Sequence, residues 1–300
     1  MARSLEGKVA IVTGAGGAIG RAIALFLANE GAKVVVNDLG AANNGEGSDA
    51  GPAQATVEMI RAAGGEAVAS TESVADWDQA QRVIERALDS YGKIDVLVNN
   101  AGNIRYATFQ DSDPADVRAL VDVHLFGSYY MARAVCPHFV AQKSGVYVNM
   151  TSSTALIGHR GNAGYAAAKM GVVGLSRSIA LDLAPFNVRS NCVAPAAISR
   201  MSPSRATPEA EALFAEKARP DQIAPLVGFL AGDASVGITG QIIGARGNEF
   251  YLYSQIRPVR TLHRDGGWSL DSIVSQLVPA WRASLTPLEE TYEVFAWPPL

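Results

Sequence analysis

The sequence "IVTGAGGAIGR", residues 11–21, joins an apolar run to a helical pattern through four glycines. It nearly matches the dinucleotide fingerprint G-x-G-x-x-G, but Ile19 stands at the third glycine position and Gly20 follows one residue later. Gly14 permits a tight turn, and Gly20 lets the following helix pack closely. Backbone amides and the positive dipole end of that helix favour a pyrophosphate. The alternative is a glycine-rich turn that binds nothing.

Composition narrows the classes of protein that this chain can be. Of 300 residues, 48% are hydrophobic and 18% are charged, which predicts a sizeable buried core. The net charge of −4 argues against a nucleic-acid surface, and the apolar runs are too short to span a membrane. Residues 1–8 lack the apolar stretch of a secretory signal, so we expect a cytoplasmic protein. Two cysteines and four histidines without ligand spacing predict neither a disulfide framework nor a metal site.

Short apolar runs alternate with amphipathic helical patterns along most of the chain. The predicted strands are 8–13, 33–38, 66–70, 94–102, 145–152, 188–195 and 240–245. The predicted helices are 21–30, 53–63, 76–91, a long one over 114–142, 163–184 and 221–233. Strands without period-2 alternation are buried on both faces. We therefore expect an α/β fold, a doubly wound, mostly parallel sheet of the Rossmann type in three layers, with right-handed crossovers. Residues 1–246 form the predicted dinucleotide-binding catalytic domain, and 247–300, with no further β-α unit, an appended C-terminal arm.

Asp38 ends the second predicted strand, 24 residues after Gly14. An acidic residue at this place accepts a hydrogen bond from the ribose 2′-hydroxyl of NAD. No Lys or Arg occurs between Asn37 and Met59, so nothing in that stretch would neutralise a 2′-phosphate. The sequence therefore favours NAD over NADP.

Tyr165 and Lys169 stand four residues apart in a predicted helix and project from one face. A nearby ammonium lowers the pKa of a phenol, as proton exchange with a substrate alcohol requires. Ser152, thirteen residues before Tyr165, ends a predicted strand and can hydrogen-bond the same oxygen. A surface pair in an ordinary helix is the alternative for Tyr165 and Lys169, but the joint spacing favours chemistry.

The glycine loop and this trio together resemble the short-chain dehydrogenase/reductase family, over about residues 5–245. The loop has the spacing T-G-x-x-x-[G/A]-x-G, with Ala18 where glycine is more usual, and "NNAG" is intact at 99–102. The resemblance implies that Tyr165 is the acid/base, that Lys169 binds the nicotinamide ribose and tunes Tyr165, and that Ser152 orients the carbonyl. The cofactor positions that it implies are Gly14, Gly17, Ala18, Ile19, Gly20, Asp38, Leu39, Ser73, Val74, Asn100, Ala101, Gly102, Tyr165, Lys169, Pro195 and Ile198.

Two positions depart from the family pattern. The family usually has an Asn whose main-chain carbonyl holds a water in a proton relay, and His124 stands there. A relay role and a packed helical histidine are both open for His124. Pro195-Ala196 replaces the family's Pro-Gly, and backbone around Ile198 is expected to meet the carboxamide.

Several short pieces resemble one branch, the (3R)-hydroxyacyl-CoA dehydrogenase region of peroxisomal multifunctional enzyme type 2, also called 17β-hydroxysteroid dehydrogenase type 4, and its bacterial relatives. They include "VVVNDLG", "VHLFGSYYMARA" and "NMTSS". The branch implies NAD and a 3-hydroxyacyl-CoA, hydroxysteroid or sterol-type substrate in lipid or steroid breakdown. We expect a mostly apolar pocket lined by Ile104, Arg105, Leu156, Ile157 and Met201. Arg200, Arg205, Lys217 and Arg219 are candidates for a CoA phosphate, with a solvated basic edge as the stronger interpretation.

Two other functions remain open at this point. One is a biosynthetic 3-oxoacyl reductase that uses NADPH, against which Asp38 argues. The other is a catalytically silent NAD-binding sensor or assembly protein, against which the intact Tyr165 and Lys169 argue. The arm carries Trp268, Trp281 and Trp297, which suit either a subunit interface of a homodimer or homotetramer or an intrachain lid.

Overall fold

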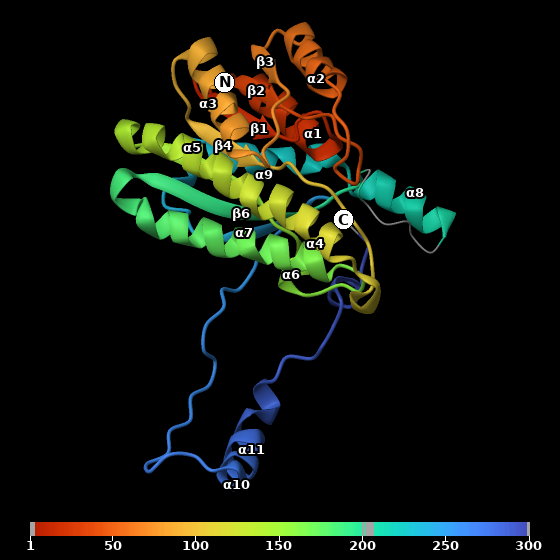
Figure 1. The fold of residues 1–300 in the computed structure, drawn as a ribbon, viewed down its shortest axis with the longest axis vertical. Coiled ribbons are helices and arrows are strands. Elements are labelled where there is room, and N and C mark those ends of the chain that lie inside the picture. Colours follow the sequence, from red (N-terminus) through yellow and green to blue (C-terminus); the bar gives the residue numbers. More distant parts are fainter. Residues whose placement is uncertain (1–3, 200, 202–206, 299–300) are drawn as a thin grey trace.

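A single eight-stranded sheet organises the chain (Figure 1). The structure is a computed structural model, and it describes residues 4–199, 201 and 207–298. The strand order is β3-β2-β1-β4-β5-β6-β7-β8; β1 to β7 run parallel, and β8 is antiparallel to β7. The bounds are β1 (Val9–Thr13), β2 (Lys33–Asn37), β3 (Ala67–Ser70), β4 (Val96–Asn99), β5 (Gly145–Met150), β6 (Val188–Ala196), β7 (Ile242–Arg246) and β8 (Glu249–Leu252). The predicted fold class is confirmed.

Helices cover both faces of the sheet, because consecutive apolar side chains of each strand point to opposite faces. Val12 belongs to the core cluster beneath α1 (Ala18–Asn29), α2 (Gly51–Ala62) and α9 (Ala224–Ala231), and its neighbour Ile11 to the cluster beneath α3 (Trp77–Tyr91) and α5 (Gly127–Gln142). The latter face also carries α7 (Ala163–Asp182). Shorter helices are η1 (Phe109–Asp111), α4 (Pro114–Val121), α6 (Ser153–Leu156), η3 (Ala184–Phe186), α8 (Pro208–Lys217), η4 (Pro220–Gln222) and η5 (Asp233–Ser235). Within the described ranges, no helix is long and apolar enough to cross a membrane.

The long helix expected over 114–142 is interrupted. A π-helical turn, η2 (Asp122–Phe126), lies between α4 and α5 and contains His124. Wider i→i+5 turns of this kind are frequent at functional sites. The 3.6-residue pattern runs through the interruption, so periodicity did not reveal it.

The chain beyond residue 246 begins with a strand, where the sequence indicated an irregular arm. Gly247 and Asn248 form a two-residue turn, with Gly247 at φ +58°, and β8 pairs Glu249 with Arg246. Such turns need a positive φ at their first residue, which glycine supplies. A Cβ at Gly244 would lie 1.9 Å from the Tyr251 ring, so this glycine lets Tyr251 lie flat on β7.

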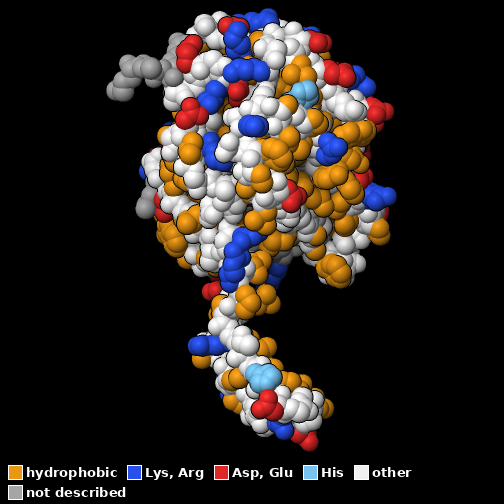
Figure 2. Space-filling view, turned by 90° about the vertical axis from the view of Figure 1, so that its left-hand side faces the viewer, with side chains coloured by type: hydrophobic (Ala, Val, Ile, Leu, Met, Phe, Trp, Pro, Cys, Tyr) orange, Lys and Arg blue, Asp and Glu red, His pale blue; other side chains and the backbone are white. Residues whose placement is uncertain are grey.

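After β8 the chain leaves the body and later returns to it (Figures 1 and 2). We call residues 256–288 the arm hairpin. It contains α10 (Leu270–Ser272), η6 (Ile273–Leu277), α11 (Val278–Trp281) and η7 (Arg282–Ser284), and it projects well away from the sheet. Residues 289–298, which include α12 (Thr291–Val294), lie back on the body, and we call them the tail.

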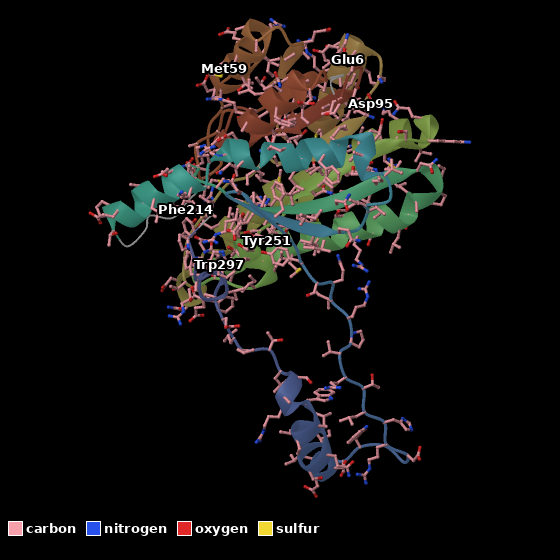
Figure 3. The ribbon with its side chains drawn as sticks, turned by 180° about the vertical axis from the view of Figure 1, so that it is seen from behind. Glu6, Met59, Asp95, Phe214, Tyr251 and Trp297 are labelled. Carbon is pink, nitrogen blue, oxygen red and sulfur yellow. The ribbon has the colours of Figure 1, made fainter. Side chains whose placement is uncertain are left out.

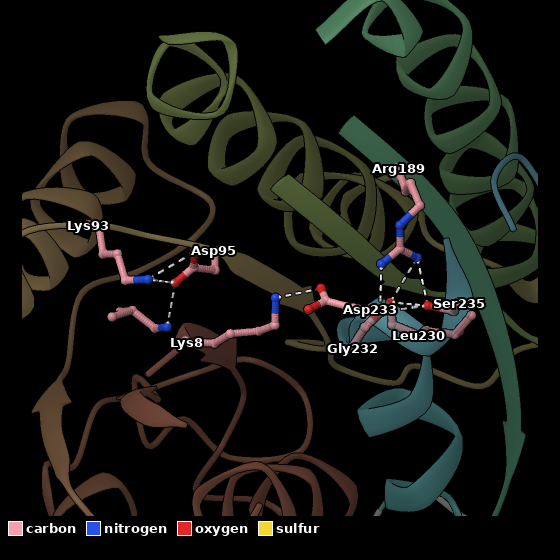
Figure 4. A network of polar contacts seen from close by, with 9 residues as sticks. Lys8, Lys93, Asp95, Arg189, Leu230, Gly232, Asp233 and Ser235 are labelled. Carbon is pink, nitrogen blue, oxygen red and sulfur yellow. Dashed lines mark hydrogen bonds and ion pairs between the residues drawn. The ribbon is translucent and has the colours of Figure 1, made fainter. Parts of the chain in front are cut away.

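A polar network secures the amino ends of the strands (Figure 4). Lys8 pairs with Asp233 at 2.8 Å, and the Asp95 carboxylate accepts from the amide of Val9 at 2.7 Å. Arg189 donates to Ser235 and to carbonyls at the end of α9. This edge is therefore occupied by structural contacts, and the opposite, carboxyl edge remains for a site.

Candidate active site

Two adjoining cavities open at the carboxyl edge of the sheet. We call the first the loop cavity, because it lies on the glycine loop; it is lined by Gly14, Gly17, Ala18, Ile19, Gly20, Asn37, Asp38, Leu39, Ala41, Ala42, Asn43, Gly45, Glu72, Ser73, Val74, Asn100, Ala101, Gly102, Asn103, Val123, Ser199 and Met201. The second, the tyrosine cavity, has a volume of about 410 Å³ and contains Ser152, Tyr165 and Lys169 in its wall. Ile19, Asn100, Ser199 and Met201 line both. A ligand can therefore extend from one cavity into the other.

The glycine loop fits a phosphate group. Gly14 has φ +65°, and a Cβ on Gly20 would lie 2.2 Å from the Gly14 carbonyl oxygen, so neither position accepts a side chain. Helix α1 begins after Gly17 with no side-chain cap and no acidic residue in its first turn. The first amides of α1 and its dipole are therefore not occupied by a capping side chain or by an acidic residue of its own first turn.

Asp38 lies at the end of β2 on the wall of the loop cavity. Its carboxylate accepts hydrogen bonds from the amides of Gly16 and Gly40, both at 2.7 Å. Glu72 is the second acidic side chain there, and no Lys or Arg is among the described residues that line this cavity. The negative charges of Asp38 and Glu72 suit the diol of the cofactor ribose and repel a 2′-phosphate on that ribose.

The "NNAG" segment connects β4 to the glycine loop. Asn100 donates its side-chain amide to the Thr13 carbonyl at 2.9 Å, and the Thr13 hydroxyl accepts from the amides of Asn100 and Ala101. Asn99 reaches Asn149 on β5 at 2.9 Å. The segment thus fixes three neighbouring strands at the point where the strand order reverses.

Ser152, Tyr165 and Lys169 come together in the tyrosine cavity. Ser152 caps α6 just beyond β5, and its hydroxyl hydrogen-bonds the hydroxyl of Tyr165 on α7. One turn later, the Lys169 ammonium donates to the Met150 carbonyl at 2.8 Å and lies 6.0 Å from the centroid of the Tyr165 ring. Lys169 is 5% exposed, so its charge lies in a region of low dielectric.

The pKa values differ from the sequence expectation. Burial raises the pKa of Tyr165, and the hydrogen bond from Ser152 lowers it by less. The expected depression by Lys169 is not found; its ammonium donates to the Met150 carbonyl and lies 6.0 Å from the centroid of the Tyr165 ring. Burial also lowers the pKa of Lys169 to about 8, with Cys192 acting in the opposite direction. In this state Tyr165 is a proton donor at neutral pH.

His124 packs beside the catalytic trio, in the wall of the tyrosine cavity. Its Nε2 lies 2.8 Å from the Asn103 carbonyl, and its Nδ1 is buried without a partner. Burial first, and then the nearby Lys169 charge, lower the pKa of His124 well below its usual value. The ring is therefore neutral, with the proton assigned to Nε2 and an unused acceptor at Nδ1. Its own main-chain carbonyl accepts from Ser128 at 2.6 Å.

The other predicted site residues divide between the two cavities and the surface. Leu39, Ser73, Val74 and Gly102 line the loop cavity, and Pro195 lines the tyrosine cavity. Ile198 is among the described lining residues of neither, and its amide donates to the Ala218 carbonyl at 2.7 Å.

The expected substrate pocket is found in part. Ile104 and Met201 line the tyrosine cavity, whereas Arg105, Leu156 and Ile157 are not among its described lining residues. Arg105 pairs with Asp116 and donates to the Asn44 carbonyl. Arg200 and Arg205 lie outside the described residues. Lys217 and Arg219 are exposed and pair with Glu216 and Asp221, as a solvated basic edge does.

Sequence reasoning missed the far wall of the tyrosine cavity. That wall contains Tyr106, Leu213, Phe214, Arg246, Tyr251, Thr291, Tyr292, Phe295 and Pro298. Tyr106 donates to the Met201 carbonyl at 2.8 Å, and burial raises its pKa to about 12. The Gly-Asn pair at 247–248, between two apolar runs, is a hairpin signal that would have located Tyr251. No local pattern brings the tail back to this place.

The profile of the short chain dehydrogenase family matches residues 8–210, more than half of the chain. The chain is a short-chain dehydrogenase/reductase. It is accordingly an oxidoreductase of a family that acts on CH–OH groups with a nicotinamide cofactor.

Relatives within this family have several functions. The chain is 41% identical over 242 residues to a Neurospora crassa peroxisomal hydratase-dehydrogenase-epimerase, covering 81% of this chain and 26% of that protein, so it spans about a quarter of that relative. A Mycobacterium tuberculosis short-chain type dehydrogenase/reductase is 43% identical over 79% of this chain and 83% of its own length. A Thermotoga maritima 3-oxoacyl-[acyl-carrier-protein] reductase is 36% identical over 81% of this chain and 98% of its own.

Solved structures of the family are also similar. A short chain dehydrogenase from Mycobacterium avium, 32% identical, matches with a TM-score of 0.84 over 96% of this chain and 98% of its own. A 7α-hydroxysteroid dehydrogenase, solved with NADH and 7-oxo glycochenodeoxycholic acid, is 32% identical, with a TM-score of 0.73 over 82% of this chain and 96% of its own. The family resemblance inferred from the sequence is confirmed.

Proposed function

We propose that this short-chain dehydrogenase/reductase interconverts a secondary alcohol and a ketone with NAD, on a 3-hydroxyacyl-CoA or a hydroxysteroid in lipid or steroid breakdown. The observation that carries the proposal is the direct junction of the loop cavity, whose described lining residues include no Lys or Arg, with the tyrosine cavity. In this proposal residues 1–246 are the catalytic domain, and 247–300 are an extension that serves it.

The chain's own residues handle the proton. A bound nicotinamide supplies the acceptor or donor of the hydride. In oxidation, the deprotonated Tyr165 oxygen takes the proton of the alcohol oxygen while the carbinol carbon loses its hydride; in reduction, protonated Tyr165 gives its proton to the ketone oxygen. The Ser152 hydroxyl, already bonded to Tyr165, holds the same substrate oxygen. Lys169 lies one helical turn away, and we assign it to the ribose of the cofactor; its charge is not among the causes that shift the pKa of Tyr165.

His124 is assigned a secondary part in this proposal. Its neutral ring lies edge-on to Tyr165, and the residue lines the cavity, while its Nδ1 is buried without a hydrogen-bond partner. We assign His124 to positioning of Tyr165. Its main-chain carbonyl is engaged by Ser128, which argues against a simple copy of the family's main-chain relay.

NAD rather than NADP is part of the proposal because of Asp38. Its carboxylate is fixed by two backbone amides at the place where a 2′-phosphate would lie. We propose that Gly14, Gly17, Ala18, Ile19, Gly20, Leu39, Ser73, Val74, Asn100, Ala101 and Gly102, which line the loop cavity, contact the cofactor, together with Pro195 of the tyrosine cavity. The backbone around Ile198 is proposed to meet the carboxamide.

The substrate class is supported by the tyrosine cavity and by the relatives. Its wall is mostly apolar and aromatic, and a volume of about 410 Å³ accommodates a lipid chain or a ring system. The Neurospora relative is named for hydratase, dehydrogenase and epimerase activities, and the hydroxysteroid dehydrogenase holds a bile acid derivative.

A biosynthetic 3-oxoacyl reductase that uses NADPH is the second candidate. It is favoured by the Thermotoga relative, whose length the match covers almost completely. The acidic wall of the loop cavity argues against it. The first candidate uses NAD with a 3-hydroxyacyl-CoA or a hydroxysteroid, and the second uses NADPH with a 3-oxoacyl thioester. One assay that varies cofactor and substrate therefore separates them.

We further propose a homodimer or homotetramer. The arm hairpin presents apolar side chains to solvent, with Ile256 83%, Leu270 76% and Leu285 67% exposed. The match to the Mycobacterium avium chain leaves 4% of the 300 residues uncovered, which is about 12 residues. Since residues 247–300 number 54, most of this extension has a counterpart in that chain. Exposed apolar patches of this kind favour burial against another subunit.

The free thiols Cys136 and Cys192 suit a reducing compartment, and we propose the cytoplasm.

The test is a turnover screen of the purified chain with NAD and NADP. The substrates are 3-hydroxyacyl-CoA esters, hydroxysteroids and 3-oxoacyl thioesters, followed by the absorbance of reduced nicotinamide. The proposal predicts NAD-linked oxidation of at least one of the first two classes. NADPH-linked reduction of 3-oxoacyl thioesters alone would instead establish the second candidate.

A further inference from the structure

The tail lines part of the tyrosine cavity and is held at both ends. At its start, the Glu290 carboxylate binds His159 at 3.1 Å and Arg160 at 2.7 Å. The amide and hydroxyl of Thr291 both donate to the Gly158 carbonyl, at 3.0 and 2.9 Å. This first clasp ties the tail to the loop between α6 and α7, close to Tyr165.

A second clasp holds the end of the tail on β7. The buried Arg246 guanidinium donates to the Trp297 carbonyl and lies 5.6 Å from the ring centroids of both Phe295 and Trp297. Glu249 completes the clasp, since one of its oxygens lies 3.3 Å from Arg246 and the other accepts from the Trp297 indole at 2.8 Å. Tyr251 packs on Phe295, with 5.0 Å between the ring centroids. Figure 3 labels Tyr251 on β8 and Trp297 in the tail.

Part of the tail lines the tyrosine cavity. The cavity wall includes Thr291, Tyr292, Phe295 and Pro298, whereas Glu293 and Val294 are not among the described lining residues. Tyr292 also packs edge-on against His159, with centroids 4.9 Å apart. A segment fixed at both ends loses little further entropy when a ligand arrives, so it can act as a rigid boundary.

We infer that the tail is a clasped wall that limits how far and how broadly a substrate can extend beyond the reacting carbon, with Phe295 as its main stop. The inference rests on the proposed function for its substrates. It assigns substrate selection to residues at the far end of the chain, which reach the site only after the excursion of the arm hairpin.

The first experiment compares wild type with Phe295→Ala and Val294→Ala, two truncations of apolar side chains in the same turn. kcat/KM is measured for 3-hydroxybutyryl-CoA and for a long-chain or steroid-side-chain 3-hydroxyacyl-CoA. Phe295→Ala should raise the ratio of bulky to short substrate about tenfold or more, since a pocket changes discrimination by such factors per methylene-sized contact. Val294→Ala should leave the ratio unchanged. A ratio that is unchanged or falls in Phe295→Ala overturns the inference.

The second experiment does not depend on turnover. Hydrogen exchange of the amides of Thr291 and Phe295 should be slow in wild type, because both are hydrogen-bonded, and faster in Glu290→Ala or Arg246→Ala. Exchange at the rate of an unstructured peptide in wild type overturns the wall. If no substrate turns over but the tail is protected as described, the proposed function fails while the wall stands.

Discussion

The imidazole of His124 lies edge-on to the phenol ring of Tyr165, with ring centroids 5.1 Å apart and planes at 88°. The two side chains come from different elements, the π-helical turn η2 and helix α7. His124 is 1% exposed, and a Cβ on Gly102 would lie 2.4 Å from its ring, so it has no room to swing away. His124 therefore packs as an uncharged group against one side of Tyr165, the proposed proton donor.

This neutrality predicts a pH dependence of stability. The unfolded chain protonates His124 near pH 6.5, whereas the buried ring stays neutral to much lower pH. Below pH 6.5 the unfolded state binds the extra proton, so the free energy of unfolding should fall by about 1.4 kcal/mol per pH unit from this group. Urea denaturation of wild type and His124→Gln at pH 5, 6 and 7 should give a shallower slope for the variant. His263→Gln, on the exposed arm hairpin, should keep the wild-type slope.

Burial of Lys169 predicts that the stability of the folded chain also changes at high pH. Its pKa is about 8 in the folded chain against 10.5 in the unfolded one, so the unfolded state binds more protons between these values. The stability of wild type relative to Lys169→Met should therefore rise between pH 8 and 10.5, by about 3 kcal/mol from a shift of this size. Parallel denaturation curves of the two proteins across that range measure it. A constant difference would mean that Lys169 titrates normally.

Asp38 predicts cofactor choice. Asp38→Ala removes the carboxylate that repels a 2′-phosphate and accepts from the ribose, so the ratio of kcat/KM with NADP to that with NAD should rise about tenfold or more. Steady-state rates with both cofactors give the ratio. Asp49→Ala serves as the control, because this exposed carboxylate belongs to the same loop but is not among the described residues that line the cavity. An equal rise in both variants would point to a general charge effect.

Gly20 predicts that the loop cannot accept a methyl group. In Gly20→Ala the Cβ meets backbone and the Asn100 amide, so the loop must move and cofactor affinity should fall at least tenfold. Gly174→Ala is the matched control, since nothing lies within 4 Å of a Cβ there, and it should stabilise helix α7 by about 0.5–1 kcal/mol. Isothermal titration with NADH and thermal melts distinguish the two effects. Unchanged affinity in Gly20→Ala would remove the loop from the binding site.

The sequence predicted the sheet and the carboxyl-edge motifs, because both depend on local signals. Apolar runs such as 33–37 are buried on both faces. A side chain at position 14 or 20 would collide with neighbouring backbone, and the spacing of these glycines predicted that only glycine fits there. The π-turn at His124 escaped, because one extra residue in a turn leaves the apolar pattern intact.

The far wall of the site escaped for a different reason. Its position depends on Arg246 and Glu290, whose partners lie 51 and about 130 residues away in the chain. Contacts between residues so far apart in the sequence depend on the folded structure and leave no periodic pattern in the sequence. The pKa of Tyr165 was likewise misjudged, since the four-residue spacing to Lys169 did not reveal that the ammonium binds the Met150 carbonyl.

The central claim is that the Tyr165 hydroxyl exchanges the substrate proton, and Tyr165→Phe tests it with the loss of one oxygen atom. With a substrate found in the screen, kcat should fall on the order of 10²- to 10⁴-fold, as expected for loss of a general acid or base. NADH affinity, measured by fluorescence titration, should stay within a few-fold of wild type. A Phe variant that turns over at the wild-type rate would contradict the account.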